Sequence, residues 1–393
     1  MPWDQARAAA VRAAGHPLPP VALALPEALG ASLAEPLTAL TDLPSFDTAA
    51  MDGWAVAGPG PWQPYDGGVL AGERPRPLDH GAAVPIATGA ELPRGATAVL
   101  RREHGARTTP DGLLRHRLPD PPAPGRDVRP RGQECRAGEP LLPAGTTVTP
   151  AVLGLAAAAG YDRLAVHRRP TIELLLLGDE LLDSGLPGDG RVRDALGPLL
   201  PPWLHRLGAE VTAVRRLADA LGPLDEAMGR STADVLVTTG STAAGPVDFL
   251  RPAIAGAGGR LLVDSVAVRP GHPMLLAELP PVAGDRSRLL VGLPGNPLAA
   301  VTGAVTLAAP LLRRLGGHVD GGPRGAVAGA PLPGHARDTR VVPVRLSAGT
   351  AVPLPFDGPA MLRGLALADA LAVVPPGGLA AGAVVEVLDV PGP

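Results

Sequence analysis

The chain has 393 residues, a formal net charge of -3 and a hydrophobic content of 46%, enough for more than one folded core. This charge balance excludes a broad basic surface for nucleic acid, and the single cysteine, Cys135, excludes an internal disulfide and a cysteine-based zinc site. No apolar run reaches the ~20 residues of a membrane-spanning helix and the N-terminus lacks a signal-peptide core, so we expect a cytoplasmic protein without a membrane partner.

Residue usage is biased toward alanine, glycine, proline and arginine. All 35 basic side chains are arginines, and Asn296 is the only asparagine. The 51 glycines and 49 prolines make about a quarter of the chain, a proportion typical of low-complexity proteins, but apolar strand-like runs recur between them. We interpret the bias as GC-rich coding of a folded protein, in which the retention of Asn296 needs a specific reason.

The first 168 residues contain two kinds of segment. Residues 3–40 and 138–168 include helical pieces rich in alanine and leucine. Residues 44–130 combine glycine and proline with short strand-like pieces such as GAAVPIATG, which indicates a β-rich region.

Strand-like and helix-like segments then alternate. The strand-like segments are 171–178, 209–218, 233–240, 260–273 and 288–297, and the helix-like segments are 194–208, 222–231 and 298–317. This alternation predicts a doubly wound α/β domain with a mainly parallel sheet, whose ligands bind at the carboxyl ends of the strands. Residues 322–393 contain short β runs, RVVPVRL and AVVEVLDV, separated by turns, which predict a small barrel or sandwich.

Three loops at strand ends could carry chemistry. GDELLDSG places Asp179 and Glu180 after the first strand, TTGSTAAGPVD ends with Asp248, and VGLPGNP leads into the last helix. Small residues let the backbone approach a phosphate, a helix N-terminus adds partial positive charge, and paired acids suit Mg²⁺. The alternative is structural, with GDEL as a helix cap and LPGNP as a rigid turn whose Asn296 caps the helix.

Ordered motifs upstream complete the pattern. They are FDTAAMDGWAV (46–56), TGAELPRGATAV (88–99) and GQECRAG (132–138). Together with GDEL, the TTGS loop, PGHP and LPGNP, they run in order over roughly residues 43 to 300 and resemble the MoeA family of molybdopterin molybdenumtransferases, which includes the gephyrin E domain.

The resemblance implies four segments. These are a helical N-terminal or linker domain from residues 1–43 with 131–168, an inserted β-rich domain at 44–130, an α/β molybdopterin-binding domain at 169–318, and a small C-terminal β-barrel domain at 319–393. It also implies an elongated homodimer, with an active cleft between the α/β domain of one subunit and the inserted domain of the other.

The implied reaction transfers molybdate to the dithiolene of adenylylated molybdopterin, with Mg²⁺ as cofactor and release of AMP. The residues implied to be catalytic are Asp52, Thr88, Glu134, Asp179, Glu180, Asp194 and Asp248, of which Glu180 and Asp248 bind the metal. Those implied to bind substrate are Gly240, Ser241, Gly245, Arg269, His272, Pro294, Gly295, Asn296 and Pro297.

The chain departs from the family pattern where phosphate contacts are expected. Ser241 replaces a glycine, Ala243 a serine and His272 the lysine of PGKP, whereas Arg269 replaces a lysine with retention of charge. Each lost contact to a charged group costs about 1.5–3 kcal/mol, so a second hypothesis is a non-catalytic paralogue that binds a pterin, a nucleotide or a partner protein. The retained carboxylates favour the enzyme.

Overall fold

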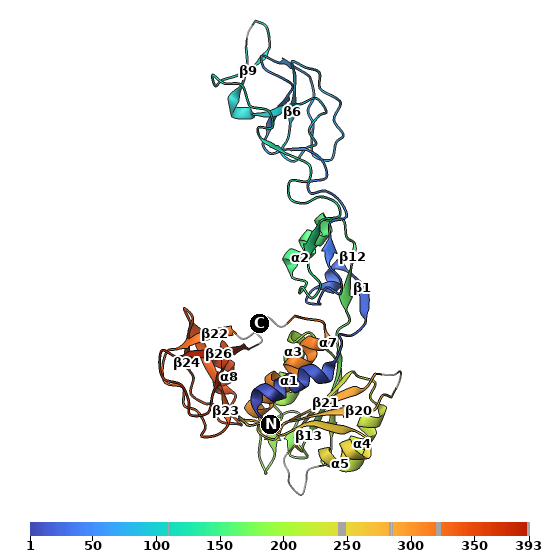
Figure 1. Ribbon diagram of the computed structural model, residues 1–393, viewed down its shortest axis with the longest axis vertical. Helices are drawn as coiled ribbons and strands as arrows, with labels where there is room; N and C mark the ends of the chain where they lie inside the picture. Colours follow the sequence, from blue (N-terminus) through green and yellow to red (C-terminus); the bar gives the residue numbers. More distant parts are fainter. Residues whose placement is uncertain (109, 243–248, 283, 285, 320–323, 391–393) are drawn as a thin grey trace.

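The computed structural model describes residues 1–390 except residues 109, 243–248, 283, 285 and 320–323. The molecule is elongated, with its domains arranged along one axis (Figure 1). An α/β domain and a β-barrel domain lie side by side at one end, a linker domain follows, and the inserted β-rich domain forms the far end. The α/β multidomain architecture predicted from the sequence is confirmed.

The α/β domain is built on one six-stranded sheet in the order β16-β13-β17-β21-β20-β18. The strands are β16 (Glu210–Leu217), β13 (Thr171–Leu177), β17 (Val235–Thr239), β21 (Arg288–Leu293), β20 (Leu275–Leu279) and β18 (Arg260–Asp264). The first four are mutually parallel, while β20 and β18 run antiparallel to their neighbours. Because Leu176 is in register with Thr239, and Thr239 with Leu293, the parallel strands end together at one edge.

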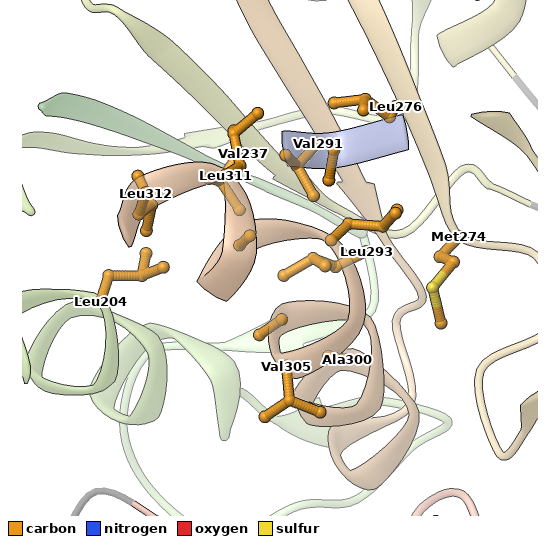
Figure 2. Close-up of a cluster of buried hydrophobic side chains, with 14 of the residues drawn as sticks. Leu204, Val237, Met274, Leu276, Val291, Leu293, Ala300, Val305, Leu311 and Leu312 are labelled. Atoms are coloured by element: carbon orange, nitrogen blue, oxygen red, sulfur yellow. The ribbon is translucent and has the colours of Figure 1, made fainter. Parts of the chain in front are cut away.

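Helices cover both faces of this sheet, as a doubly wound fold requires. On one face lie α1 (Trp3–Ala14), α3 (Leu196–Arg206) and a long helix made of α6 (Pro297–Gly303), the π-helical η3 (Ala304–Ala308) and α7 (Ala309–Leu315). On the other face lie α4 (Leu221–Arg230) and α5 (Leu250–Gly256). Figure 2 shows Leu311 of the long helix near Val291 of the sheet, and both belong to the same buried core as Leu293 and Val305.

Helix α1 packs on the α/β domain. Its alanine-rich face packs against α7, the Trp3 indole donates to Thr306 Oγ1 at 3.1 Å, and Arg7 donates to the carbonyl of Val305 at 2.6 Å. Residues 3–14, which the resemblance groups with residues 131–168, therefore pack on the α/β domain. An apolar helical face predicts that the helix is buried, but it does not identify the surface that buries it.

The linker domain joins two separate stretches of chain. It contains the strand pairs β1 (Pro20–Ala24) with β12 (Arg163–His167) and β2 (Leu37–Thr38) with β11 (Pro140–Leu142), together with η1 (Leu25–Ala28) and α2 (Pro150–Ala158). Leu33, Val148, Val152 and Leu164 share its core. The region is richer in strands than the expected helical domain, because the alternating residues 20–24 and 163–167 pair with each other.

The inserted domain is a small β structure. A four-stranded sheet in the order β5-β6-β4-β7 comprises β5 (Gln63–Pro64), β6 (Ala82–Ile86), β4 (Gly53–Val56) and β7 (Ala98–Arg101). Two short strand pairs flank this sheet. One is β3 (Thr48–Ala49) with β10 (Val128–Arg129), and the other is β8 (Gly105–Arg107) with β9 (Leu114–His116). Helix η2 (Arg102–His104) directly precedes β8. Trp62, Leu100 and Leu114 form the centre of one of its cores.

The C-terminal domain is the predicted barrel. It comprises β22 (Arg324–Ala328), β23 (Thr339–Ser347), β24 (Thr350–Pro353), β25 (Ala370–Val374) and β26 (Val384–Asp389), with α8 (Arg363–Leu367). Pairing of β23 with β25 closes it. Strand β19 (Val268–Arg269), from the α/β part of the chain, pairs with β23 and ties the two domains together.

In the part of the chain that the structure describes, one helix is long and apolar enough to cross a membrane by length and composition alone. It is Pro297–Leu315, with a mean hydropathy of 1.3, and 89% of its most apolar stretch is buried inside the fold. This is the burial of a core helix, and Figure 2 shows the helix packed on the sheet.

Candidate functional site

Strand-end turns meet at the carboxyl edge of the parallel strands. The N–H of Gly240 donates to the carbonyl of Leu293 at 2.9 Å. Gly240 has a φ of 86°, and a Cβ there would lie 3.2 Å from the carbonyl oxygen of Leu177, so the position favours glycine. A Cβ on Gly295 would lie 3.7 Å from the Cα of Gly240, which places the LPGNP turn beside the TTGS turn. The sequence predicted these turns separately, and the fold joins them.

Carboxylates gather beside these turns. Asp179 and Glu180 are exposed after β13, and the N–H of Asp219, after β16, donates to Asp179 Oδ1 at 3.4 Å. Burial, followed by the charges of Glu180 and Asp179, raises the pKa of Asp219 above its usual value. Negative charge is thus concentrated at this edge, where a cation would relieve it. Among the described residues, no three histidine, cysteine or acidic side chains form a ready-made metal site.

Asp219 was not among the residues identified from the sequence. Its signal was present, since LAD follows a strand in the same way as GDE follows β13. The Ser241 hydroxyl lies 3.4 Å from Asp219 Oδ1 and donates to it. Ser241 also has a φ of 49°, so it occupies the left-handed region that normally favours glycine. Gly245 and Asp248, predicted to lie on the same loop, fall outside the described residues.

Asp194 is buried, with its carboxylate facing inward. Oδ1 accepts hydrogen bonds from the N–H groups of Leu196 at 2.9 Å and Gly197 at 3.0 Å, and Oδ2 lies 2.5 Å from the Arg216 guanidinium. A carboxylate with these partners caps the first turn of α3. In this chain Asp194 therefore holds α3 against β16 and has no free oxygen facing the edge where Asp179 and Glu180 lie.

Asn296 occupies the N-cap position of α6, and Pro297 is the first helical residue. The Asn296 side chain makes no capping hydrogen bond. The N–H groups of Leu298 and Ala299 donate to the carbonyl of Pro359 in the barrel domain, at 2.9 and 3.2 Å. These two helix N–H groups therefore already have a hydrogen-bond acceptor in the barrel domain. The exposed Asn296 amide remains available to a ligand.

A cavity of about 440 Å³ lies where the α/β domain meets the barrel, and we call it the domain-junction cavity. Arg269, His272 and Asn296 line it from the α/β side, and Arg340 and Asp357 from the barrel side. A Cβ on Gly271 would lie 2.9 Å from the carbonyl oxygen of Ala299, so only glycine lets the PGHP turn pack this closely on α6. Predicted substrate-binding residues from two separate loops, PGHP and LPGNP, thus face one cavity.

The arginines of this cavity are already paired. Arg269 Nε lies 2.8 Å from Asp338 Oδ2, and Arg340 Nη2 lies 2.7 Å from Asp357 Oδ2. The hydrogen bond from Arg269 is the main cause that holds the pKa of Asp338 below its usual value. His272 differs, because its Nδ1 atom is buried and none of the described residues forms a hydrogen bond with it.

A second group of predicted residues lies in the inserted domain. The N–H and the hydroxyl of Thr88 donate to Asp52 Oδ1 at 2.7 and 2.8 Å, and these bonds hold the pKa of Asp52 below its usual value. A cavity of about 520 Å³ beside Asp52 is lined by Trp54, Arg102 and Arg107. Trp54 and the two arginines were not identified from the sequence, and they make this cavity suitable for an aromatic ring that carries negative charge.

Within one chain the predicted residues form separate groups. Asp52 and Thr88 lie in the inserted domain, at the opposite end of the molecule from β13 and β21 (Figure 1). Glu134 lies where the chain re-enters the linker domain, with its N–H donating to the carbonyl of Leu43 at 2.8 Å and its side chain exposed. Among the described residues, those of the sheet edge and of the domain-junction cavity adjoin each other at the LPGNP turn, whereas Asp52 and Thr88 contact each other in the inserted domain.

Comparison with known families matches nearly the whole chain. The MoeA N-terminal region (domain I and II) matches residues 1–160, the probable molybdopterin binding domain matches residues 173–314, and the MoeA C-terminal region (domain IV) matches residues 325–390. These segments agree with the order of domains in the fold.

Individual relatives give the same result. Molybdopterin molybdenumtransferase of Synechococcus elongatus is 32% identical over 296 residues, which are 71% of this chain and 72% of that protein. The Nostoc protein of the same name is 30% identical over 74% of this chain and 68% of its own. A crystal structure of a MoeA protein from Pyrococcus horikoshii is 26% identical, with a TM-score of 0.77 and 98% of both chains covered.

Proposed function

The chain belongs to the MoeA family of enzymes in molybdenum cofactor biosynthesis, and from this premise we propose that it transfers molybdate to the dithiolene of adenylylated molybdopterin, releasing AMP. The observation that carries the proposal is the meeting of the small-residue turns at Gly240 and Gly295 with the carboxylates of Asp179 and Glu180. Backbone N–H groups at such turns suit phosphate oxygens.

In this proposal, adenylylated molybdopterin binds at the turns of the sheet edge and molybdate binds in the domain-junction cavity. The phosphate and pterin parts of adenylylated molybdopterin lie on the turns at Gly240, Ser241 and Pro294–Pro297, where the Asn296 amide is available to them. Molybdate, a tetrahedral oxyanion, enters the domain-junction cavity beside the guanidinium groups of Arg269 and Arg340.

Magnesium fits the sheet edge by its donor chemistry. Asp179, Glu180 and Asp219 supply carboxylate oxygens. The pKa of Asp219 is raised first by burial and then by the charges of Glu180 and Asp179. Mg²⁺ binds through one or two carboxylates while keeping several waters. Glu180 and Asp248 are the proposed ligands, and Asp179 and Asp219 lie near Glu180. When bound, the ion would neutralise phosphate charge on the nucleotide that leaves.

A second subunit completes the proposed site. Asp52, Thr88 and the cavity lined by Trp54 lie far from the sheet edge of their own chain (Figure 1). In the proposed homodimer the inserted domain of one subunit meets the α/β domain of the other. A site shared between subunits then contains Asp52 and Thr88 from one chain and the sheet-edge residues from the other. We place this reaction in the cytoplasm.

The direct test supplies adenylylated molybdopterin, molybdate and Mg²⁺ to the purified chain and measures AMP release together with formation of active cofactor in an apo-molybdoenzyme. We expect both products above background, with large losses in Glu180→Gln and Asp52→Asn. A variant of the distant ion pair, Arg324→Gln, serves as the control. Binding of the pterin nucleotide without AMP release would support the non-catalytic paralogue instead.

A further inference from the structure

The domain-junction cavity has two arginines but little positive charge. Arg269 pairs with Asp338 at 2.8 Å, and Arg340 pairs with Asp357 at 2.7 Å. Each guanidinium is therefore balanced by its own carboxylate before any ligand arrives. The charges of these two pairs sum to zero, so a dianion entering the cavity meets no net compensating charge from them.

The other groups beside the cavity that could attract an anion already take part in hydrogen bonds within the protein. The N–H groups of Leu298 and Ala299, at the N-terminus of α6, donate to the carbonyl of Pro359. His335, in the loop before β23, lies 3.4 Å from Asp338, and its Nδ1 accepts hydrogen bonds from the N–H groups of Arg337 and Asp338. His335 does not line the cavity.

His272 is the lining group that can still add charge. His272 lines the cavity, and its Nδ1 is buried with no hydrogen-bond partner among the described residues. The charged and titratable groups around it are Arg269 at the end of β19, His335 and Asp338 before β23, Arg340 on β23, and Asp357 after β24. A buried ring nitrogen without a partner is costly, and a bound oxyanion would accept a hydrogen bond from it.

We infer that His272 takes up a proton from solvent when a dianionic tetrahedral oxyanion enters the domain-junction cavity, so that anion binding is proton-linked and dianions are selected over monoanions. The inference rests on the proposed function, since molybdate is the dianion supplied by that reaction. Binding breaks no bond: the ring nitrogen gains a proton and becomes a donor to an oxyanion oxygen. Histidine is the residue whose charge changes near neutral pH, so the coupling between anion binding and proton uptake should be measurable near neutral pH.

The consequence is a defined pH dependence. Where the free histidine is neutral and the bound one is protonated, the dissociation constant for the dianion rises about tenfold for each pH unit. A lysine at this position would remain charged throughout and give no such slope. His272→Lys is thus a gain-of-affinity control at alkaline pH, whereas His272→Gln removes the added charge at every pH.

Calorimetry on the full chain measures this directly. Sodium molybdate alone is titrated from about pH 6.5 to about pH 8.5 in pairs of buffers with different ionisation enthalpies, and the dependence of the observed enthalpy on the buffer gives the number of protons taken up. We expect uptake to approach one proton per anion in the wild type near the alkaline end. His272→Lys and His272→Gln should take up none, and His335→Gln should behave as wild type. The monovalent oxyanion perrhenate should bind more weakly than molybdate.

Each outcome decides the inference. Molybdate binding without proton uptake in the wild type, or unchanged uptake in His272→Gln, would overturn it while leaving the proposed function intact. Absence of molybdate binding at any pH also overturns it, and the AMP-release assay then shows separately whether the proposed function fails.

Discussion

Asp194 and Arg216 form a close ion pair behind the carboxyl edge of the sheet, with Asp194 Oδ2 2.5 Å from Arg216 Nη2 and the aspartate side chain only 2% exposed. The same carboxylate caps α3 through the N–H groups of Leu196 and Gly197. One side chain thus fixes a helix and an edge strand to each other. A retained acid can therefore support a site without touching the ligand.

Removal of this carboxylate should destabilise the chain. Asp194→Ala leaves the α3 N–H groups and the Arg216 guanidinium without their partner, at a cost of about 2–3 kcal/mol in the free energy of unfolding. Asp194→Asn keeps an oxygen for the cap and should recover part of this loss. Urea denaturation followed by circular dichroism measures both. Equal stability of wild type and Asp194→Ala would contradict the structural role.

Thr88 should set the acidity of Asp52. Thr88→Val removes the hydroxyl bond but keeps the backbone bond, so the lowered pKa of Asp52 should move back toward its usual value. Because the folded pKa is depressed, the contribution of this group to stability is present above the unfolded pKa and lost as the pH falls through the folded value. Carbon-detected NMR titration of the Asp52 carboxyl measures the shift, with Thr88→Ser as the control. An unchanged titration in Thr88→Val would refute this role.

The fold was predictable wherever a local pattern had one structural meaning. The continuous apolar run at 171–177 became the buried strand β13, and the apolar segment after LPGNP became the long core helix. The helical face of residues 3–14 was equally clear, but its partner α7 lies about three hundred positions later in the sequence, at residues 309–315. No local pattern encodes such a partner, because it depends on how the whole chain packs.

The site was predictable as a set of turns and acids, but not as contacts. Strand-end loops share one edge in any parallel sheet, so the neighbourhood of Gly240 and Gly295 followed from topology. The hydrogen bond from the Leu298 N–H to the carbonyl of Pro359 could not be predicted in this way, because it depends on how the barrel domain docks on the α/β domain. Nor could composition show that Arg269 and Arg340 are each neutralised by an aspartate.

Asp219 should respond to pH in the opposite sense to Asp52. Its pKa is raised, first by burial and then by Glu180 and Asp179, so the folded state binds its proton more tightly than the unfolded state. Stability from this group therefore increases as the pH falls through the raised value and decreases as the pH rises. Asp219→Asn should be more stable than wild type at neutral pH and should gain less thermal stability from added MgCl₂. Thermal melts with and without MgCl₂ measure both effects, and an equal response of the two proteins to the ion would contradict a cation at this edge.

Sharing of the site between subunits should appear as complementation. Asp52→Asn damages the part of the active site in the inserted domain, and Glu180→Gln damages the part at the sheet edge. A homodimer of either variant therefore contains no intact active site. A mixed dimer has one site with both defects and one with neither. Refolding the two inactive variants together should therefore restore up to about a quarter of wild-type turnover at random pairing, measured as AMP release. Two variants within the same part, Asp179→Asn with Glu180→Gln, are the matched control and should not complement.

Substitution of Asn296 distinguishes a residue that contacts the ligand from one that only caps a helix. Its side chain makes no capping hydrogen bond, so Asn296→Ala should change the free energy of unfolding by less than the roughly 1 kcal/mol typical of a lost N-cap. The same substitution should weaken binding of adenylylated molybdopterin by about tenfold or more, because one amide contact to a charged ligand is lost. Thr149, whose hydroxyl does accept from Val152 at the start of α2, is the matched cap, and Thr149→Ala should cost about 1 kcal/mol with unchanged affinity. Denaturation and calorimetry on the two variants measure both quantities, and an Asn296→Ala protein that is destabilised but binds normally would make Asn296 a structural residue.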